Sequence, residues 1–252
     1  MANIGVALQL YTVRDQLRDD FAGALKAVAQ MGYPAVELAG YGGRSAKELK
    51  QLLDDLGLRV AGDHVGLDRL EQDLSAVIDT SMTLGNRYVV CPFVPETRRR
   101  DEAGWRQLAT TLSEIGGKCT ERGLQLCYHN HAFEFTPVDG TNGFELLFGN
   151  SNPRYVQMEL DVFWAKKGGD DPAAIMGRYP GRCPIVHLKD MTADQQQTFA
   201  EVGEGTMDFQ SIFRAAPTGG AAWYVVEQDR CSRPPLESAQ LSLRHLREWG
   251  IA

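Results

Sequence analysis

The chain has little of what marks a secreted or nucleic-acid-binding protein. Its 252 residues include five cysteines and carry a formal net charge of −7. An odd number of cysteines without a Cys-x-x-Cys pair is typical of reduced thiols in a cytoplasmic protein and does not predict a disulfide framework. The negative charge offers no basic footprint to a phosphate backbone, so nucleic acid is not expected as a partner.

Long apolar runs are also missing. No apolar run reaches the roughly 18 residues that a membrane-spanning helix needs. The stretch MANIGVALQLYTVRD has no basic segment of the kind that opens a signal peptide. We therefore expect no membrane partner and a cytoplasmic location. Apolar residues make up 43% of the chain and charged residues 23%, which is ordinary for a globular protein that buries a substantial core.

A repeated pattern runs along the chain, in which a helical segment stops at glycine and a short apolar run begins directly afterwards. It occurs in AVAQMGYPAVEL, LLDDLGLRVAG, SMTLGNRYVVC and KCTERGLQLCY. Glycine is favoured just past a helix end because it accepts the left-handed conformation that closes the last turn. The apolar runs are rich in Val, Leu and Tyr and mostly do not alternate, which suits strands buried on both faces of a parallel sheet.

These runs predict a single barrel. We expect strands at residues 4–10, 35–39, 59–64, 88–93, 125–130, 156–161, 185–189 and 223–228. Helical stretches separate them, and no linker or change of composition divides the chain. Such a series of strand–helix units predicts an α/β fold, a (β/α)8 TIM barrel that forms one domain over residues 1–252. An open doubly wound sheet is the alternative, but the Gly-rich dinucleotide loop after the first strand is absent.

Helix boundary signals fit this pattern. Ser45 and Glu48 have the spacing of a capping box and predict a helix start. Asp171 followed by Pro172 predicts another, with the aspartate as the N-cap and the proline in the first turn. Leucines near helical spacing predict a last helix at about residues 235–249.

Ionisable residues gather where the expected strands end. They stand in the stretches VELAGYGG, AGDHVG, CYHNHAFE, MELDVFW, VHLKD and VVEQDR. In a (β/α)8 barrel the carboxyl ends of the strands form the face that carries the active site. Polar residues are expected at any strand end, but runs of Glu, Asp, His and Lys that begin within the last apolar residues are not. We therefore predict a functional site on this face.

Four of these ionisable residues come from the last four expected strands or their exits: Glu134, Asp161, His187 and Glu227. Three carboxylates and one imidazole at the mouth of a barrel would repel one another unless a cation neutralised them. Mostly oxygen ligands with one nitrogen suit Mn²⁺, Mg²⁺, Co²⁺ or Fe²⁺, and Zn²⁺ also fits. Taken singly, Asp161 could equally cap a helix, and Glu227 could pair with Arg230 or Lys189. Taken together, the four residues predict a divalent metal site.

Several stretches together resemble one known family. CYHNHAFEF, ELDVFW, DDPAAIMGRYPGRCPIVHLKDM, AEVGEGTMDF and YVVEQDR look like the sugar phosphate isomerase/epimerase family. These are the xylose isomerase-like barrels that also include inosose dehydratases and ketose 3-epimerases. The resemblance covers nearly the whole chain, from LQLYTVRD to the final helix. It implies a divalent metal, Mn²⁺ before the others, held by Glu, Asp, His and Glu from the later strands.

The metal ligands that the resemblance implies match this chain at three positions: Asp161, His187 and Glu227. The first Glu is the exception, because Tyr128 or His129 stands where ketose epimerases of the family carry a ligand Glu inside the fifth strand. Glu134 follows several residues later. We predict that it completes the ligand set, and a substrate-facing acid is the alternative.

The chemistry that fits these groups is proton abstraction next to a carbonyl, through a metal-stabilised enediolate. Glu134 and Glu227 could act on opposite faces of a ketose, with His131 as a further acid/base group. The sequence therefore predicts a metal-dependent sugar or cyclitol isomerase/epimerase. If a β-hydroxyl leaves after the proton moves, the same site gives a dehydratase or β-elimination lyase, which is the alternative.

Further residues at the strand ends are candidates for contacts with the sugar or cyclitol: His64, His129, Lys189, Glu37 and Trp164. His129 and His131 are two apart, so on a strand they would point to one side. Lys189 could hold a substrate oxygen or pair with Asp190, and Trp164 could wall the pocket or pack in the core. Because the chain has no Walker loop and no distinct anion cradle, a phosphorylated substrate is not required.

Two other classes of protein are weaker alternatives. An apurinic-site endonuclease shares this barrel, but its multinuclear zinc site and basic DNA face do not fit five histidines and a net charge of −7. A non-catalytic, accessory sugar-binding barrel is the other, because a partner chain could complete the site. A homo-oligomer is compatible with the sequence.

Overall fold

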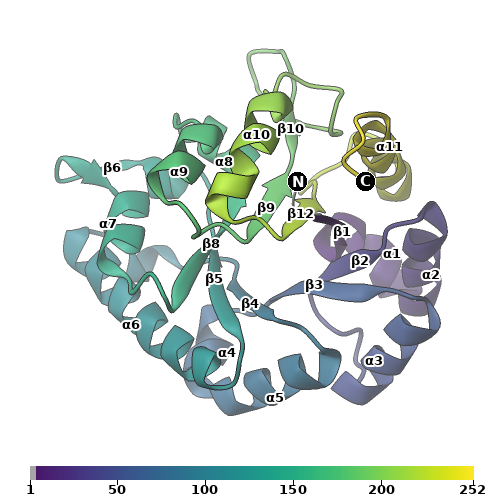
Figure 1. The fold of residues 1–252 in the computed structure, drawn as a ribbon, viewed down its shortest axis with the longest axis horizontal. Coiled ribbons are helices and arrows are strands. Elements are labelled where there is room, and N and C mark those ends of the chain that lie inside the picture. The colour runs from purple at the N-terminus through teal and green to yellow at the C-terminus, as the bar shows by residue number, and fades with distance from the viewer. Residues whose placement is uncertain (1–3) are drawn as a thin grey trace.

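The computed structural model describes residues 4–252, and its centre is a closed barrel of parallel strands. The strands lie around the barrel in chain order, and the last pairs with the first (Figure 1). They are β1 (Gly5–Gln9), β2 (Ala35–Leu38), β3 (Arg59–His64), β4 (Tyr88–Cys91), β5 (Gln125–His129), β8 (Val156–Asp161), β9 (Ile185–Leu188) and β12 (Trp223–Val226). The predicted (β/α)8 barrel is confirmed.

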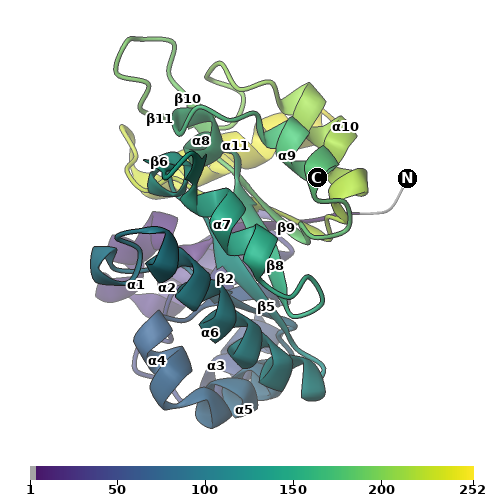
Figure 2. The same ribbon diagram turned by 90° about the vertical axis from the view of Figure 1, so that its left-hand side faces the viewer.

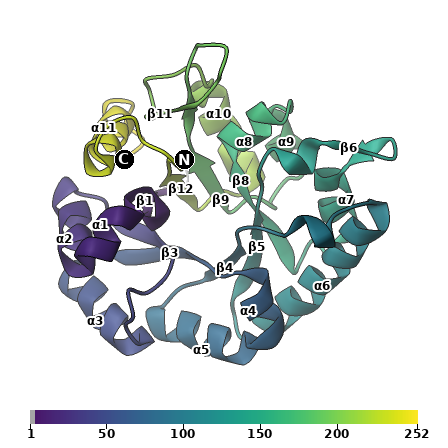
Figure 3. The same ribbon diagram turned by 180° about the vertical axis from the view of Figure 1, so that it is seen from behind.

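Helices form an outer ring around the strands (Figures 1 and 3). They are α1 (Arg14–Asp19), α2 (Phe21–Met31), α3 (Ala46–Asp55), α4 (Leu67–Gln72), α5 (Leu74–Leu84), α6 (Glu102–Glu121), α7 (Gly143–Asn150), α8 (Val162–Lys167), α9 (Pro172–Arg178), α10 (Phe209–Gly219) and α11 (Pro235–Glu248). Most of the buried apolar side chains lie in one cluster that includes residues of these helices and of the strands. No helix within residues 4–252 is both long and apolar enough to cross a membrane.

Short elements lie in the segments that follow several of the barrel strands. They are the 3-10 turns η1 (Leu10–Val13), η2 (Glu96–Arg98) and η3 (Phe133–Phe135), and the antiparallel pairs β6 (Pro137–Val138) with β7 (Thr141–Asn142) and β10 (Asp190–Met191) with β11 (Phe199–Ala200). In Figure 2, β6, β10 and β11 lie in the upper left of the view.

The helix boundaries confirm the capping signals in the sequence. Ser45 accepts a hydrogen bond from the Glu48 amide, and the Glu48 carboxylate accepts one from the Ser45 amide at 2.9 Å. The Asp171 side chain caps α9 just before Pro172. The expected strand at residues 88–93 extends past the observed end at Cys91, because the chain leaves the sheet there to enter the loop before η2.

The inside of the barrel has an apolar layer with a polar layer above it. The apolar layer is a cluster of Ala7, Ala35, Ala61, Tyr88, Val90, Cys127, Ile185 and Val225. Six of these residues are followed two positions later by a buried polar side chain: Gln9, Glu37, Asp63, His129, His187 and Glu227. Because strand side chains alternate between faces, these polar groups stand one layer nearer the carboxyl ends. The fold therefore builds a buried polar site on an apolar floor.

Candidate metal centre

Two overlapping groups of side chains occupy the carboxyl end of the barrel. The donor atoms in each group lie within 4.8 Å of one another. We call His129, Asp161, His187 and Glu227 the outer group, and His64, His129, Glu159 and His187 the inner group. Asp161 follows Glu159 by two residues on β8, so the outer group lies farther toward the mouth. The two histidines that belong to both groups join the two layers.

In the outer group, carboxylate oxygens lie near one ring nitrogen of each shared histidine. His187 Nδ1 is 2.8 Å from Glu227 Oε2 and 4.0 Å from Asp161 Oδ2, and His129 Nε2 is 3.8 Å from Asp161 Oδ2. The other oxygen of Asp161, Oδ1, accepts a hydrogen bond from the Trp164 amide at 2.8 Å and caps α8. The structure therefore confirms the helix-capping role of Asp161, and its Oδ2 stays within the outer group.

Lys189 supplies a buried positive charge beside the outer group. Its Nζ lies 2.9 Å from Asp161 Oδ2, 2.7 Å from Glu227 Oε2 and 2.8 Å from Asp229 Oδ2. The expected alternative pairing with Asp190 is wrong, because the Asp190 carboxylate instead accepts backbone hydrogen bonds from residues 191–207. Trp164 lies close by, with its ring centroid 5.8 Å from Lys189 Nζ.

The inner group converges on the carboxylate of Glu159. Its Oε2 is 2.7 Å from His64 Nε2, 2.8 Å from His129 Nδ1 and 3.1 Å from His187 Nε2. Glu159 is wholly buried, and its Oε1 has no hydrogen-bond partner among the described residues. Sequence reasoning missed this residue, although its position two before Asp161 and opposite His129 in the β5–β8 register places it on the same inner face.

Glu37 lies beside the inner group on the other side of the barrel. Its Oε2 is 2.6 Å from His187 Nε2 and 3.4 Å from His64 Nε2, and it accepts a hydrogen bond from Gln9 Nε2 at 2.8 Å. A Cβ atom at Gly62 would lie 2.3 Å from Glu37 Oε1, so only glycine leaves room for this carboxylate.

Burial and neighbouring charges act in opposite directions on the outer carboxylates. Burial raises the pKa of Asp161 to about 6, against the lowering effects of Lys189 and His187. Burial also disfavours charge on Glu227, but the Lys189 ammonium and the His187 imidazole outweigh it and hold the pKa of Glu227 below its usual range. Burial disfavours charge on His187, but Glu159, Glu37 and Glu227 outweigh it and hold the pKa of His187 well above its ordinary value.

Glu134 lies outside both groups, in the turn that follows β5. Its Oε1 accepts a hydrogen bond from the Tyr128 hydroxyl at 2.7 Å, and its Oε2 accepts one from the His131 amide at 2.7 Å. The side chain is wholly buried, and burial raises its pKa to about 8. Glu134 therefore fixes the exit of β5, and both of its oxygens already have donors.

A pocket with a volume of about 350 Å³ opens above the two groups. His64, His129 and Glu227 line its floor, and Glu37, Lys189 and Trp164 do not line it. The exposed rings of Tyr11 and Phe93, at 43% and 49% relative exposure, stand at its wall with His131. The His131 ring stacks on Phe133 with 5.3 Å between centroids, and its Nδ1 is buried without a partner among the described residues.

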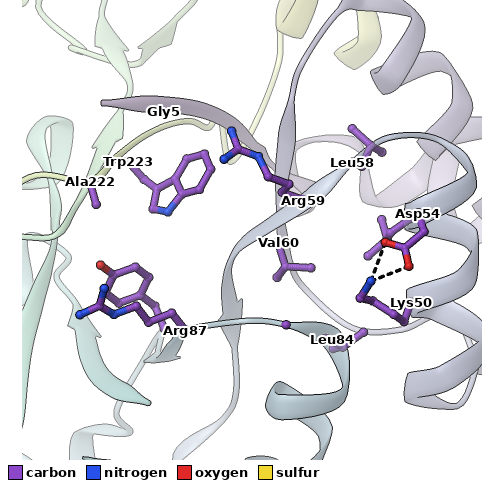
Figure 4. Close-up of a pocket in the computed structure, with 13 residues that line it drawn as sticks. Gly5, Lys50, Asp54, Leu58, Arg59, Val60, Leu84, Arg87, Ala222 and Trp223 are labelled. Carbon is purple, nitrogen blue, oxygen red and sulfur yellow. Dashed lines mark hydrogen bonds and ion pairs between the residues drawn. The ribbon is translucent and has the colours of Figure 1, made fainter. Parts of the chain in front are cut away.

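A larger pocket, of about 550 Å³, lies at the opposite end of the barrel (Figure 4). Its wall includes Gly5, Arg59 and Trp223, which are the first residues of their strands. The Arg59 guanidinium lies 4.9 Å from the centroid of the Trp223 ring. No member of the outer or inner group lines this pocket. His64, His129 and Glu227 of the two groups therefore face the smaller pocket.

This fold is that of one known protein family. The model of the xylose isomerase-like TIM barrel family matches residues 25–249, and the chain belongs to this family. This confirms the resemblance noted in the sequence.

Particular relatives cover most of the chain. It is 26% identical to an inosose dehydratase of Geobacillus kaustophilus over 88% of this chain and 85% of the relative. It is 27% identical to the rhizopine catabolism protein MocC of Rhizobium meliloti over 90% of this chain and 81% of that protein. A solved sugar phosphate isomerase/epimerase of Parabacteroides distasonis matches with a TM-score of 0.83 and 27% identity, covering 100% of this chain and 96% of the other.

Proposed function

We propose that this protein is a divalent-metal-dependent enzyme that takes a proton from the carbon next to the carbonyl of a sugar or cyclitol. The observation that carries the proposal is the outer group, in which donor atoms of two histidines and two carboxylates lie within 4.8 Å of one another. These side chains are buried, and two of them, His129 and Glu227, line a pocket at the carboxyl end of the barrel. Membership of the xylose isomerase-like family supports the same assignment.

The proposed metal ligands are the four members of the outer group: His129, Asp161, His187 and Glu227. The sequence points to Glu134 as the first ligand, but both of its oxygens accept hydrogen bonds within its own turn. His129 takes its place, since it stands on the inner face of β5 with Nε2 toward Asp161. Two imidazole nitrogens and two carboxylates fit a first-row divalent ion. We propose Mn²⁺ first, with Fe²⁺, Co²⁺, Zn²⁺ and Mg²⁺ as alternatives.

A bound divalent ion supplies Lewis acidity that polarises the substrate carbonyl. The chain then has to move the proton. Glu227 is the carboxylate of the outer group that lines the pocket, and we assign the acceptance of that proton to it. Burial lowers the pKa of His131 to about 3, so its imidazole is neutral. We propose that its ring, which lines the pocket, hydrogen-bonds the substrate oxygen whose charge changes as the proton moves. Glu134 supports this step indirectly, because its carboxyl group holds the His131 backbone amide.

The pocket also indicates the kind of substrate. No lysine or arginine of residues 4–252 lines it, which favours a sugar or cyclitol without a phosphate group. His64 is placed to hydrogen-bond a substrate hydroxyl, and the exposed rings of Tyr11 and Phe93 offer apolar faces to a sugar ring. Lys189, Trp164 and Glu37 lie behind this wall, and we assign them to the support of the ligands.

Isomerisation or epimerisation is the first proposed outcome, in keeping with the solved relative described as a sugar phosphate isomerase/epimerase. Dehydration of an inosose is the second. It is favoured by the similarity to inosose dehydratases over most of the chain. Both outcomes begin with the same proton transfer, and they differ in whether a neighbouring hydroxyl group then leaves.

The test combines metal content with proton exchange. The protein is stripped with a chelator, reloaded with Mn²⁺ and incubated with ketoses and inososes in D₂O. We expect deuterium at the carbon next to the carbonyl, and an unsaturated product if dehydration follows. Asp161→Asn should lose both metal and exchange, whereas Glu134→Gln should keep the metal. Retention of metal and exchange by Asp161→Asn would overturn the proposed function.

A further inference from the structure

Two buried glutamates contact the ring nitrogens of the proposed ligand histidines that face away from the outer group. We propose that Glu159 and Glu37 are positioning residues that select the tautomers of these histidines. His129 then presents Nε2 to the outer group, and His187 presents Nδ1. The inference rests on the proposed function, because it concerns how the chain prepares its imidazoles for a cation in the outer group.

The contacts of His129 determine its tautomer. Its Nδ1 is 2.8 Å from Glu159 Oε2, whereas its Nε2 faces Asp161 Oδ2 at 3.8 Å. Ring nitrogens of three histidines converge on Glu159 Oε2, so this oxygen acts as an acceptor and the His129 nitrogen beside it carries the hydrogen. Nε2 then keeps its lone pair for a cation, in the arrangement common to metal-binding histidines whose second nitrogen donates to a carboxylate.

The contacts of His187 give the opposite tautomer once a cation takes the nitrogen that faces the outer group. Its Nε2 is 2.6 Å from Glu37 Oε2 and 3.1 Å from Glu159 Oε2, so this nitrogen carries the hydrogen. Its Nδ1 lies on the side of the outer group, 2.8 Å from Glu227 Oε2 and 4.0 Å from Asp161 Oδ2. Without a cation this nitrogen also carries a hydrogen, which a cation bound in the outer group would displace. Two histidines on different strands thus need opposite tautomers, and one layer of carboxylates provides both.

Other buried groups hold the two glutamates in place. Gln9 Nε2 donates to Glu37 Oε2 at 2.8 Å. His64 Nε2 lies between the glutamates, 2.7 Å from Glu159 Oε2 and 3.4 Å from Glu37 Oε2. Both glutamates are wholly buried, and an ionised carboxylate at such a depth is costly unless N–H donors compensate it. The imidazoles and the glutamates therefore stabilise each other's orientation.

A second cation in the inner group is the competing explanation for the same cluster. It would have to bind His129 and His187 through the nitrogens that now face Glu159. With a cation in the outer group as well, both rings would lose their N–H groups and bridge two ions. The proposed arrangement needs one cation and leaves every N–H with an acceptor. The number of metal ions per chain therefore separates the two explanations.

The first experiment measures Mn²⁺ affinity and stoichiometry by titration calorimetry on the full chain. The variants are Glu159→Ala, Glu159→Gln and the control Glu201→Gln, which alters a glutamate that is buried outside both groups and accepts from Ser238. We expect one Mn²⁺ in the unaltered protein and a dissociation constant raised about 10–100-fold in Glu159→Ala. Glu159→Gln should lie between, because its amide oxygen still accepts a hydrogen bond but without charge. The control should bind like the unaltered protein.

The second experiment reads the tautomers directly, by ¹⁵N NMR of the histidine rings in the Zn²⁺-loaded protein. We expect the hydrogen on Nδ1 of His129 and on Nε2 of His187. Glu159→Gln should mix the tautomers of His129 and spare those of His187, which Glu37 still holds. Glu37→Gln should do the reverse. A general loss of structure in a variant would instead mix the tautomers of both His129 and His187.

The outcomes separate this inference from the proposed function. An unaltered protein that binds no divalent ion would overturn both. One Mn²⁺ per chain with unchanged affinity and tautomers in both Glu159 variants would overturn the positioning role and leave the proposed function standing. Two ions per chain would assign the inner group to a second cation and would also overturn it.

Discussion

Glu134 belongs to neither the outer nor the inner group, and its side chain holds the turn after β5. Its carboxyl group joins the Tyr128 hydroxyl on β5 to the His131 amide in the turn that follows, within hydrogen bonds of 2.7 Å. Burial raises its pKa from an ordinary value of 4.5 to about 8. Because burial favours the protonated form of the Glu134 carboxyl group, its contribution to the free energy of unfolding depends on pH.

We expect Glu134→Gln to make the protein less sensitive to pH between about 5 and 8. With the pKa raised from 4.5 to about 8 in the folded state, the stabilising contribution is complete below pH 4.5 and is lost as pH rises toward 8. Glutamine resembles the protonated acid and does not titrate. The difference in Tm between variant and unaltered protein should therefore grow in favour of the variant from pH 5 to pH 8. A difference that stays constant in thermal unfolding across this range would contradict the raised pKa.

Lys189 is the residue whose loss should harm folding most within the site. It is wholly buried among three carboxylates at 2.7–2.9 Å. Lys189→Met would leave these charges without their cation, and breaking a buried pair of this kind costs about 3–5 kcal/mol. We expect that loss in the free energy of unfolding of the chelator-treated protein, measured with urea.

Lys50→Met provides the matched control for this prediction. Lys50 pairs with Asp54 on the surface of α3, and exposed pairs contribute about 0–1 kcal/mol. The prediction for Lys189 fails if the two variants lose similar stability. Added Mn²⁺ should restore part of the loss in Lys189→Met, because the outer carboxylates then regain a cation.

At the scale of single elements, the sequence predicts the strands better than it predicts the site. Glycine-terminated helices and apolar runs place all the barrel strands, because buried parallel strands leave a strong local signal. The alternation of strand side chains also predicts that Asp161 and His187, which are partners in the β8–β9 register, lie on the same inner face. These parts of the site follow from local pattern alone.

The rest of the site depends on contacts that a local pattern does not reveal. Glu134 stands outside the outer group because the chain turns into η3 after β5 and its side chain folds back onto Tyr128. Glu159 is hidden within an apolar run, and its role emerges only from the pairing of β5 with β8 opposite His129. Glu37 reaches His187 across the barrel, which requires the closed sheet.

One carboxylate, that of Asp190, accepts several backbone hydrogen bonds from the segment after β11. Asp190 Oδ2 accepts from the amides of Gly203 at 2.9 Å and Gly205 at 3.0 Å, and its Oδ1 accepts from Met191 at 2.7 Å and Met207 at 3.0 Å. An asparagine in either orientation would offer only one acceptor oxygen to these four amides. The conformation of residues 203–207 therefore depends on having both carboxylate oxygens.

We expect Asp190→Asn to increase amide hydrogen exchange at residues 203–207 and to destabilise the fold. A hydrogen bond to a charged group contributes about 1.5–3 kcal/mol, and the variant loses two such bonds. Asp194→Asn is the control, because all the hydrogen bonds to its side chain from residues 192, 196 and 197 go to Oδ1, which asparagine retains. Equal exchange rates in the two variants would show that Asp190 does not hold the segment.

At the scale of the whole molecule, the site exists only when the barrel is closed. Glu37 and His187 are 150 residues apart in sequence but 2.6 Å apart in space. Barrel closure by β1 and β12 brings Glu227 to the same layer. Since no short segment contains the outer group, an unfolded chain cannot present these ligands together. Any cation that binds them should therefore stabilise the native state.

Metal removal should consequently lower the Tm of the whole protein. A ligand that binds only the native state at a concentration of 100 Kd stabilises it by about 2.7 kcal/mol. For a chain of this size, each 1 kcal/mol shifts Tm by about 2–4 °C. We expect the chelator-treated protein to gain several degrees as Mn²⁺ is added in thermal unfolding, whereas Asp161→Asn should gain none. The shift should rise with the logarithm of Mn²⁺ concentration above Kd, which distinguishes site binding from a general effect of salt. An equal gain in Asp161→Asn would place the stabilising ion outside the outer group.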